Sequence, residues 1–208
     1  MEETMSSAPY RISGEGLAKK FGRNTLFRDI SLTAATGESL SITGPNGSGK
    51  STLMKILTGI QRPSAGRVDL ASGASIEPAR WLSHIGYTGP LVNPYDELTG
   101  WENITFAARR ADAGDRACRL LESFGLGLHR DKKVKHYSSG MKQRLKLILA
   151  VLNDPPVLML DEAGTNLDAA GTALLHSYLE SVRKEKIIIL ATNDPLEEKL
   201  CGRTISLG

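Results

Sequence analysis

The chain has few cysteines and no long hydrophobic run. Cys118 and Cys201 lie far apart without the spacing of a metal site, so we expect two reduced thiols in or near the core. The longest apolar runs, at 147–152 and 187–191, are much shorter than the ~20 residues of a membrane-spanning helix. These two shortages argue against a disulfide-stabilised secreted domain and predict no transmembrane segment.

An apolar segment in the first ten residues and a strong net charge are also lacking. Residues 1–10 are acidic and serine-rich without an apolar segment, which predicts no secretory signal and a cytoplasmic location. The net charge of +3 does not by itself indicate a nucleic-acid partner. One local excess of basic residues lies between positions 129 and 146, which hold seven Lys or Arg and the single acid Asp131.

What the chain does have is the composition and pattern of a globular α/β domain. Its 208 residues are 40 % hydrophobic and 24 % charged, which fits one soluble domain. Residues 157–160 and 187–191 are continuous apolar runs, typical of parallel strands buried on both faces. Residues 168–184 between them carry leucines at helical spacing and are long enough for a right-handed crossover. We therefore expect an α/β fold with a mainly parallel central sheet.

The strongest local signal is a glycine-rich loop between a predicted strand and a predicted helix. Residues 38–43 predict the strand, residues 50–59 predict the helix, and residues 44–52 match the pattern GxxxxGK[ST]. Because glycine lacks a Cβ atom, the backbone can curl until its N–H groups point inward and form an anion nest. The expected phosphate-binding residues are Gly44, Pro45, Asn46, Gly47, Ser48, Gly49, Lys50, Ser51 and Thr52.

Three side chains of this loop have individual roles in the hypothesis. Lys50 is expected to reach the β- and γ-phosphates of a nucleoside triphosphate. Ser51 is expected to ligate Mg²⁺, and Thr52 to support the α-phosphate side. The alternative interpretation is a glycine-rich turn with a structural lysine.

Two acidic residues follow a predicted buried strand. Asp161 and Glu162 come directly after residues 157–160, so both lie at the carboxyl edge of the sheet, where ligands of open α/β sheets bind. Asp161 suits a role beside Mg²⁺, and Glu162 suits orienting and deprotonating an attacking water. Such a pair alone is more often a solvated strand end, but beside a phosphate loop it indicates nucleotide hydrolysis.

With these motifs the chain resembles the ATP-binding cassette (ABC) ATPases. Residues 137–144, Tyr-Ser-Ser-Gly-Met-Lys-Gln-Arg, are similar to the LSGGQ-type signature of that family, and Gly140 lies 21 residues before Asp161 (161 minus 140). Thr-Asn-Leu-Asp at 165–168 matches the family's D-loop, and Phe21 sits where the family keeps an adenine-stacking aromatic. The resemblance covers nearly the whole chain.

The resemblance implies a P-loop NTPase core with an N-terminal antiparallel β portion and an inserted helical subdomain. Residues 1–208 would form one domain, with 1–89 and 150–208 as the catalytic core and about 90–149 as the helical subdomain. Two such cassettes would sandwich ATP and Mg²⁺, each nucleotide lying between the phosphate loop of one copy and the signature of the other. The residues that the resemblance adds to the nucleotide site are Phe21, Ser138, Ser139, Gly140 and Asp168. Ser138 is also the expected N-cap of a helix over 139–152.

The chain departs from the family pattern where the family has a glutamine that contacts Mg²⁺ and water. Residues 88–90 read Thr-Gly-Pro, and the candidates to take over that contact are Thr88 and Asn93.

A second departure concerns the switch histidine of the family, which is replaced by Asn193. Asparagine can donate a hydrogen bond to a γ-phosphate oxygen but cannot carry a proton. The signature also has Ser139 for a glycine and Met141 for a glutamine. Since losing one positioned donor typically costs ~10² or more in turnover, we expect slow hydrolysis with retained binding. Lys50, Glu162 and Asn193 are the expected catalytic residues.

The leading functional hypothesis is the ATP-hydrolysing subunit of an ABC membrane transporter, whose ATP-driven dimerisation powers separate integral membrane subunits. It would lie at the cytoplasmic face of the membrane as a homodimer or paired with another ABC subunit. Residues 95–103 are the expected contact with the membrane partner. Tyr95, Trp101 and Phe106 are nevertheless more typical of a helical core than of a docking surface.

Two alternatives stay open. The first is a soluble ABC-type ATPase that works in cytosolic assembly or on nucleic acid, supported by the basic stretch 129–146. Outward basic side chains usually serve solubility, so no nucleic-acid partner is expected. The second is a nucleotide-gated binding protein with negligible hydrolysis. Glu162 argues against it, because a site without turnover needs no water-activating acid.

Overall fold

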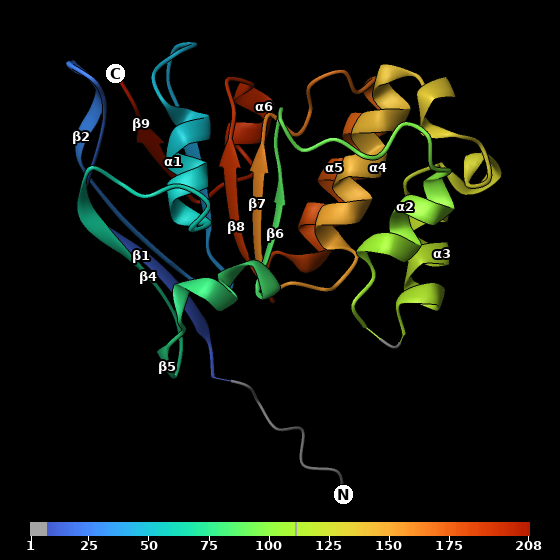
Figure 1. Ribbon diagram of the computed structural model, residues 1–208, viewed down its shortest axis with the longest axis horizontal. Helices are drawn as coiled ribbons and strands as arrows, with labels where there is room; N and C mark the ends of the chain where they lie inside the picture. The colour runs from blue at the N-terminus through green and yellow to red at the C-terminus, as the bar shows by residue number, and fades with distance from the viewer. Residues whose placement is uncertain (1–7, 111) are drawn as a thin grey trace, which may run out of the picture.

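The computed structural model describes residues 8–110 and 112–208 (Figure 1), so the prediction about a secretory signal falls mostly outside the described residues. The elements, in chain order, are β1 (Tyr10–Phe21), β2 (Asn24–Ala35), β3 (Ser39–Thr43), α1 (Lys50–Leu57), β4 (Ala65–Ser72), β5 (Ala74–Ser75), η1 (Pro78–Ser83), β6 (Ile85–Thr88), α2 (Gly100–Ala107), α3 (Ala113–Ser123), η2 (Gly127–His129), η3 (Val134–His136), α4 (Ser139–Val151), β7 (Val157–Asp161), α5 (Ala169–Val182), β8 (Ile187–Ala191), α6 (Pro195–Glu198) and β9 (Arg203–Ser206). The η elements are short 3-10 helices.

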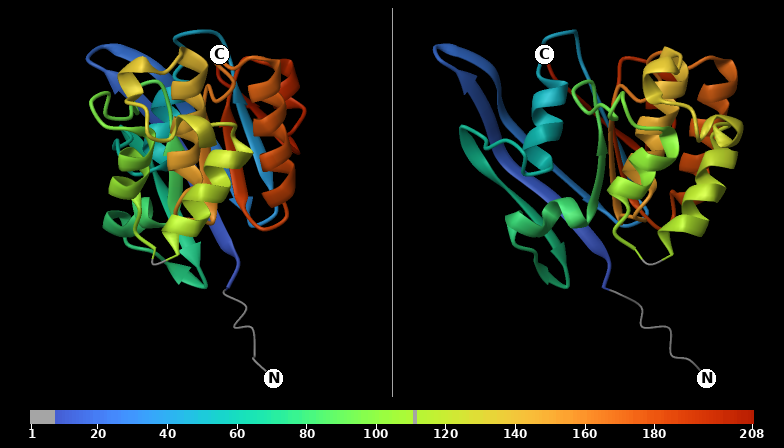
Figure 2. Two further views of the ribbon diagram at one scale, coloured as in Figure 1. Left: turned by 90° about the vertical axis from the view of Figure 1, so that its right-hand side faces the viewer. Right: turned by 45° about the vertical axis from the view of Figure 1, so that its right-hand side comes forward.

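A five-stranded sheet in the order β6-β7-β8-β3-β9 forms the centre, and every neighbouring pair in it is parallel. β7 and β8 are buried along their whole length because helices cover both faces of the sheet. α1 lies on one face, and α4 and α5 lie on the other (Figure 2). The predicted strands, the crossover helix and the parallel sheet are therefore confirmed.

A second, antiparallel sheet in the order β2-β1-β4-β5 lies on the outer side of α1 (Figure 2). Ile12, Leu17 and Leu70 of this sheet share one core with Leu53 and Met54 of α1. Alternating apolar residues along β1 and β2 supply that buried face. The predicted N-terminal antiparallel portion is confirmed.

The middle of the chain is mainly helical, as predicted. Ile104 of α2 and Leu121 of α3 share one core with Leu158 and Leu160 of β7, and α4 lies between them. Because this core is continuous across α4, the division at residues 89 and 150 stays a prediction. Among the described residues, no helix is both long and apolar enough to span a bilayer.

Three side chains expected in the core lie at the surface. Tyr95 is 59 % exposed and Phe106 is 72 % exposed, and their rings meet edge to face with centroids 5.5 Å apart. Helix α2 buries only Gly100, Asn103 and Ile104, so Phe106 falls on its solvent side. Cys118 is exposed on α3, whereas Cys201 is half-buried, and both are free thiols. The core interpretation was wrong for Tyr95, Phe106 and Cys118.

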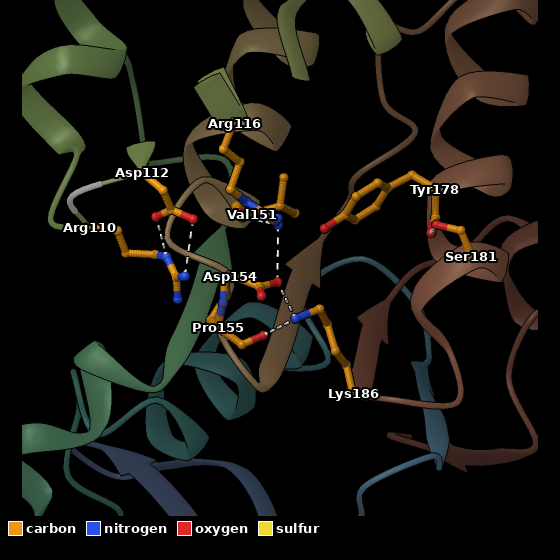
Figure 3. A network of polar contacts seen from close by, with 9 residues as sticks. All are labelled: Arg110, Asp112, Arg116, Val151, Asp154, Pro155, Tyr178, Ser181 and Lys186. Atoms are coloured by element: carbon orange, nitrogen blue, oxygen red, sulfur yellow. Dashed lines mark hydrogen bonds and ion pairs between the residues drawn. The ribbon is translucent and has the colours of Figure 1, made fainter. Parts of the chain in front are cut away.

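A polar network ties the end of α4 to the starts of β7 and β8 (Figure 3). The buried Lys186 donates from Nζ to Asp154 Oδ1 at 2.7 Å and to the carbonyl of Pro155 at 2.9 Å. Arg116 of α3 donates to the same Oδ1 and to the carbonyl of Val151, both at 3.1 Å. Burial opposes ionisation of Asp154, but Lys186 and Arg116 outweigh it and lower the pKa of that carboxyl. The network lies at the amino ends of the strands, away from the edge described next.

Candidate functional site

The carboxyl ends of three adjacent strands bring the expected site residues together. β7 ends at Asp161, Asn193 follows β8, and β3 runs into the loop that begins at Gly44. Ala191 of β8 lies opposite both Asp161 and Ile42, because β8 is paired with β7 and with β3. Parallel strands place these ends on one edge, the upper edge in Figure 1. Residues far apart in the sequence thereby become neighbours.

The glycine-rich loop has the curled backbone that the motif requires. Gly44, Gly47 and Gly49 have φ angles of +143°, +86° and +105°, which side-chain-bearing residues rarely adopt. A Cβ atom at position 44 would collide with the carbonyl oxygen of Leu207. Among the described residues no side chain caps α1, and its first turn holds no acid. Its first N–H groups are therefore available to an anion.

Lys50 lies at the wall of a cavity formed by this loop. Its Nζ donates to the carbonyl oxygens of Gly44 at 2.7 Å and Pro45 at 3.3 Å. The cavity has a volume of about 260 Å³ and is lined by Leu26, Asn46, Gly47, Gly49, Lys50, Ser51, Thr52 and Glu162. We call it the phosphate-loop cavity. The loop motif and one of the two acids therefore face a common space.

Asp161 has the properties of a cation ligand. It is 2 % exposed, and neither carboxylate oxygen has a hydrogen-bond partner among the described residues. Burial raises its pKa; the Ser51 hydroxyl opposes this rise, and the charge of Glu162 adds to it. A buried carboxylate without a partner is costly, and Mg²⁺ prefers carboxylate and hydroxyl oxygens. Asp161 and Ser51 therefore fit a divalent cation.

Glu162 lies between two cavities. It lines the phosphate-loop cavity and a second cavity of about 280 Å³, which it shares with Thr192, Asn193 and Glu197. Its backbone is left-handed, with φ of +54°, which is uncommon for a residue other than glycine. Its N–H donates to the carbonyl of Ala191 at 2.9 Å. A carboxylate at the border of the phosphate-loop cavity can accept a proton from a water molecule there.

Asn193 contacts the glycine-rich loop directly. Its Nδ2 donates to Oδ1 of Asn46 at 3.0 Å, although the two residues are 147 positions apart. The residue at the expected switch position therefore lies within hydrogen-bond distance of the phosphate loop. No local sequence pattern could have shown this contact.

The signature residues lie at the same edge but away from the phosphate-loop cavity. Ser138 caps α4 by accepting the N–H of Met141 at 3.2 Å, as predicted. Ser138 and Ser139 are exposed, and the start of α4 lies across the central sheet from the start of α1 (Figure 1). Within the described residues, neither they nor Gly140 line the cavity. One chain therefore presents the phosphate loop and the signature on separate parts of its surface.

Phe21 and Asp168 have different surroundings. Phe21 is 54 % exposed at the end of β1, with the ammonium of Lys19 5.2 Å from its ring centroid, which excludes a core role. Leu26 of β2, and not Phe21, is among the described residues that line the phosphate-loop cavity. Asp168 caps α5 by accepting the N–H of Gly171 at 2.8 Å. The nucleotide contacts expected of Phe21 and Asp168 stay predictions.

Neither candidate for the absent glutamine lies at this cavity. Thr88 is opposite Leu160 in the register of β6 and β7, and Leu160 belongs to the core under α4. Side chains alternate along a strand, so Thr88 points to the α4 face and Asp161 to the α1 face. Asn93 lines a separate groove beside Tyr95. Both candidates are therefore displaced from the position expected of them.

Three further residues near the site were not expected from the sequence. Tyr87 lies on the face of Asp161; burial, with the charge of Asp161 adding to it, raises its pKa to about 12. Gln143 is buried and donates to the carbonyl of Ala163 at 2.8 Å. Glu197 is 3 % exposed, and its Oε1 has no hydrogen-bond partner among the described residues. Only Gln143 carried a sequence signal, because it lies inside the signature.

Comparison with known proteins shows which family has this arrangement of phosphate loop, signature and acid pair. A family model described as ABC transporter matches residues 27–165. The chain belongs to the ABC transporter family. The match includes the phosphate loop, the signature and the acid pair, so the resemblance drawn from these motifs is confirmed.

Relatives of this ABC protein include the uncharacterized ABC transporter ATP-binding protein YdbJ of Bacillus subtilis (strain 168), 35 % identical over 199 residues. The cytochrome c biogenesis ATP-binding export protein CcmA of Brucella abortus (strain 2308) is 33 % identical over 191 residues. The alignments cover 92 % and 89 % of this chain, and the chain spans 64 % of YdbJ and 86 % of CcmA.

Solved structures agree with the family. The ATP-binding cassette MJ0796, solved as a dimer in a post-hydrolysis state with ADP and phosphate, matches with a TM-score of 0.83 and 25 % identity. The alignment covers 94 % of each chain. The fold is therefore that of an ABC cassette, which confirms the expected P-loop NTPase architecture and assigns the chain to the ABC ATPases that bind ATP.

Proposed function

We propose that this ABC protein binds ATP with Mg²⁺ at the phosphate loop, hydrolyses it slowly to ADP and phosphate, and drives a membrane transporter formed by other subunits. The observation that carries the proposal is the meeting of the curled loop and Glu162 at one cavity. Beside it lies the buried carboxylate of Asp161, whose oxygens have no hydrogen-bond partner in the described part of the chain. The relatives YdbJ, named as an ABC transporter ATP-binding protein, and CcmA, named as an ATP-binding export protein, support the same function.

Each charged or polar group at the edge has a distinct task in this proposal. Lys50 exchanges its carbonyl partners for phosphate oxygens. Ser51 and Asp161 would hold Mg²⁺, which would neutralise part of the charge on the phosphates. Glu162 orients a water molecule and accepts its proton as the oxygen attacks the γ-phosphorus. Asn193 donates from Nδ2 to a γ-phosphate oxygen in place of Asn46.

Slow turnover follows from two features of the same edge. Asn193 can position the γ-phosphate but cannot carry a proton. Thr88 points to the opposite face of the sheet, so it supplies no donor at the place of the absent glutamine. Removal of one such donor typically lowers turnover by ~10² or more, while binding is carried by the loop.

A second copy of the chain, or another ABC subunit, completes each nucleotide site. The start of α4, which holds Ser138, Ser139 and Gly140, lies at the same edge as the phosphate loop. None of the three is among the described residues that line the phosphate-loop cavity, which suits contact with the nucleotide of a partner cassette. The free N–H groups at the start of α4 would face the γ-phosphate, and Asp168 would lie at the dimer interface. Phe21, exposed near the hairpin turn, is available to stack on adenine.

The contact with the membrane subunits is proposed at an exposed apolar surface of the helical region. Tyr95 and Phe106 line a groove of about 360 Å³ together with Leu149 and Asn153. Leu91, on the same connection, is 77 % exposed. An exposed apolar patch with a neighbouring groove is typical of a protein interaction site. As a peripheral subunit, the protein would lie at the cytoplasmic face of the membrane.

The basic stretch gives little support to a nucleic-acid function. Lys133 and Lys135 pair with Glu97, at 3.6 and 3.0 Å, and Lys142 pairs with Asp96 at 2.7 Å. These acids lie outside the stretch in sequence but next to it in the fold, so they neutralise part of its charge.

Calorimetry on the purified chain tests the proposal. ATP is titrated with Mg²⁺ and with a chelator, and phosphate release is followed for the parent and for Glu162→Gln. We expect Mg²⁺-dependent binding by both proteins and hydrolysis by the parent alone. Arg67→Gln, on the outer antiparallel sheet, is the matched surface control. Absence of Mg²⁺-dependent binding by the parent, or equal inertness of parent and Glu162→Gln, would contradict the proposal.

A further inference from the structure

The signature helix α4 reaches the backbone of the expected general base through one buried side chain. Gln143 is 8 % exposed. Its Nε2 donates to the carbonyl oxygen of Ala163 at 2.8 Å and lies 3.4 Å from the carbonyl oxygen of Glu162. A single amide thus contacts two consecutive carbonyls in the turn that follows β7.

We propose that Gln143 is a positioning residue for hydrolysis, which holds the peptide after Glu162 so that the carboxylate stays at the phosphate-loop cavity. The inference rests on the proposed function. It assigns a role that acts through Glu162 and involves no contact between Gln143 and ATP.

The turn needs such a restraint because its backbone is strained. Glu162 and Asn166 both have left-handed backbones, with φ of +54° and +66°. Residues other than glycine stay in this region only when their surroundings hold them there. The N–H of Glu162 bonds to Ala191 of β8 at 2.9 Å, and Gln143 of α4 holds the carbonyl side. Without the Nε2 donor one side of this restraint is lost.

A second contact joins α4 to the same turn. A Cβ atom at Gly140 would lie 3.1 Å from the carbonyl oxygen of Asn166, so the helix start lies directly against the backbone of Asn166. Ser138 caps the same helix and is the residue expected to face the nucleotide of a partner cassette. Gln143 therefore connects, within one chain, the helix that contacts one nucleotide with the acid that acts on the other.

Gln143→Met tests the inference, because methionine keeps the length of the side chain and removes the donor. The control is Gln61→Met, at the chain's other glutamine, which lies in the turn after α1. For each full-length protein we would measure the Kd for ATP with Mg²⁺, KM, kcat, the melting temperature, and amide hydrogen exchange in residues 161–168.

We expect Gln143→Met to lower kcat by about 10- to 10²-fold, since misplacing a reacting group by ~1 Å can cost ~10². Kd and KM should stay within about twofold, because the loop that binds ATP is unchanged. Exchange in residues 161–168 should become faster, and Gln61→Met should match the parent throughout. An unchanged kcat overturns the inference, and so does a loss of kcat that is accompanied by an equal loss of ATP affinity.

A second variant covers the case in which Gln143→Met does not fold. Gln143→Glu keeps the shape but turns carboxylate oxygens toward the two carbonyls, so its kcat should be low. Its kcat relative to the parent should rise as the pH falls, because the protonated carboxyl can donate. A ratio that does not change with pH overturns the inference. If the parent does not hydrolyse ATP, the proposed function is refuted instead. In that case, unchanged amide hydrogen exchange in residues 161–168 of the variant would still overturn the positioning role.

Discussion

Replacing Asp161 with asparagine is expected to stabilise the free protein and to abolish Mg²⁺-dependent ATP binding. Asp161 is 2 % exposed, and its oxygens lack hydrogen-bond partners among the described residues. Burial raises its pKa above the ordinary value of 3.8. Without a cation, this buried carboxylate lowers the stability of the fold, and the proposed Mg²⁺ would supply its missing partner.

The sign and size of the effect follow from this pKa shift. Because the folded-state pKa is the higher one, the protonated carboxyl folds more favourably than the carboxylate. The stability that protonation gives is fully present below the unfolded pKa and is lost as the pH rises through the folded pKa. A buried unsatisfied polar group costs roughly 1–3 kcal/mol, and asparagine removes the charge but not the burial. We expect a gain of about 1–2 kcal/mol at neutral pH, or roughly 2–8 °C in Tm for a chain of this size.

Thermal and urea unfolding of parent and Asp161→Asn, without Mg²⁺ or nucleotide, measure this difference. The gain should shrink at acidic pH, where the parent carboxyl is protonated. With Mg²⁺ and ATP at about 100 times Kd, the parent should gain ~2.7 kcal/mol and become the more stable protein. Asp131→Asn, whose side chain is 80 % exposed, should stay within about 0.5 kcal/mol of the parent. An Asp161→Asn protein that is less stable at neutral pH, or a difference independent of pH, would refute the reasoning.

Three further substitutions have expected outcomes. Asn193→His should raise steady-state phosphate release by roughly tenfold or more, because histidine can donate a hydrogen bond and carry a proton. Lys186→Met should lower the free energy of unfolding in urea by about 1–2 kcal/mol. This figure allows for solvent screening of the ion pair, because the side chain of Asp154 is 41 % exposed. Since the folded pKa of Asp154 is lowered, the part of this loss that comes from the Asp154 pair should disappear as the pH falls through that pKa, while the part from the bond to Pro155 should remain. Phe106→Ser should reduce co-purification with membrane subunits, while Kd for ATP and Tm stay unchanged.

Each of these predictions has a matched control or a contradicting result. An unchanged or lower rate for Asn193→His counts against the proposal that Asn193 slows turnover. Lys184→Met, at an exposed lysine two residues before Lys186, should leave stability unchanged. Leu128 is 100 % exposed in the helical region, so Leu128→Ser is the control for Phe106→Ser. Equal co-purification of these two variants would contradict the proposed docking surface.

Much of the fold could be predicted because its signals are local. Continuous apolar runs at 157–160 and 187–191 predicted strands that are buried on both faces, and both are central strands of the parallel sheet. Ser138 was predicted as an N-cap and is one, since capping depends on a hydroxyl and an N–H three residues away. Tyr95 and Phe106 were placed in the core wrongly. Tyr95 lies in the connection before α2, and Phe106 lies on the side of α2 that packs on no other described element, so their apolar character did not indicate burial.

What the sequence by itself determined is the chemistry carried by consecutive residues. Glycines at 44, 47 and 49 allow the backbone angles of an anion nest, and the flanking strand and helix place it at the sheet edge. Only the tertiary structure decided which distant side chains share that edge. The bond between Asn193 and Asn46 depends on the order of β7, β8 and β3, and the bond from Gln143 depends on the packing of α4. Such contacts arise from the pairing of segments that are remote in the chain, and no local spacing encodes them.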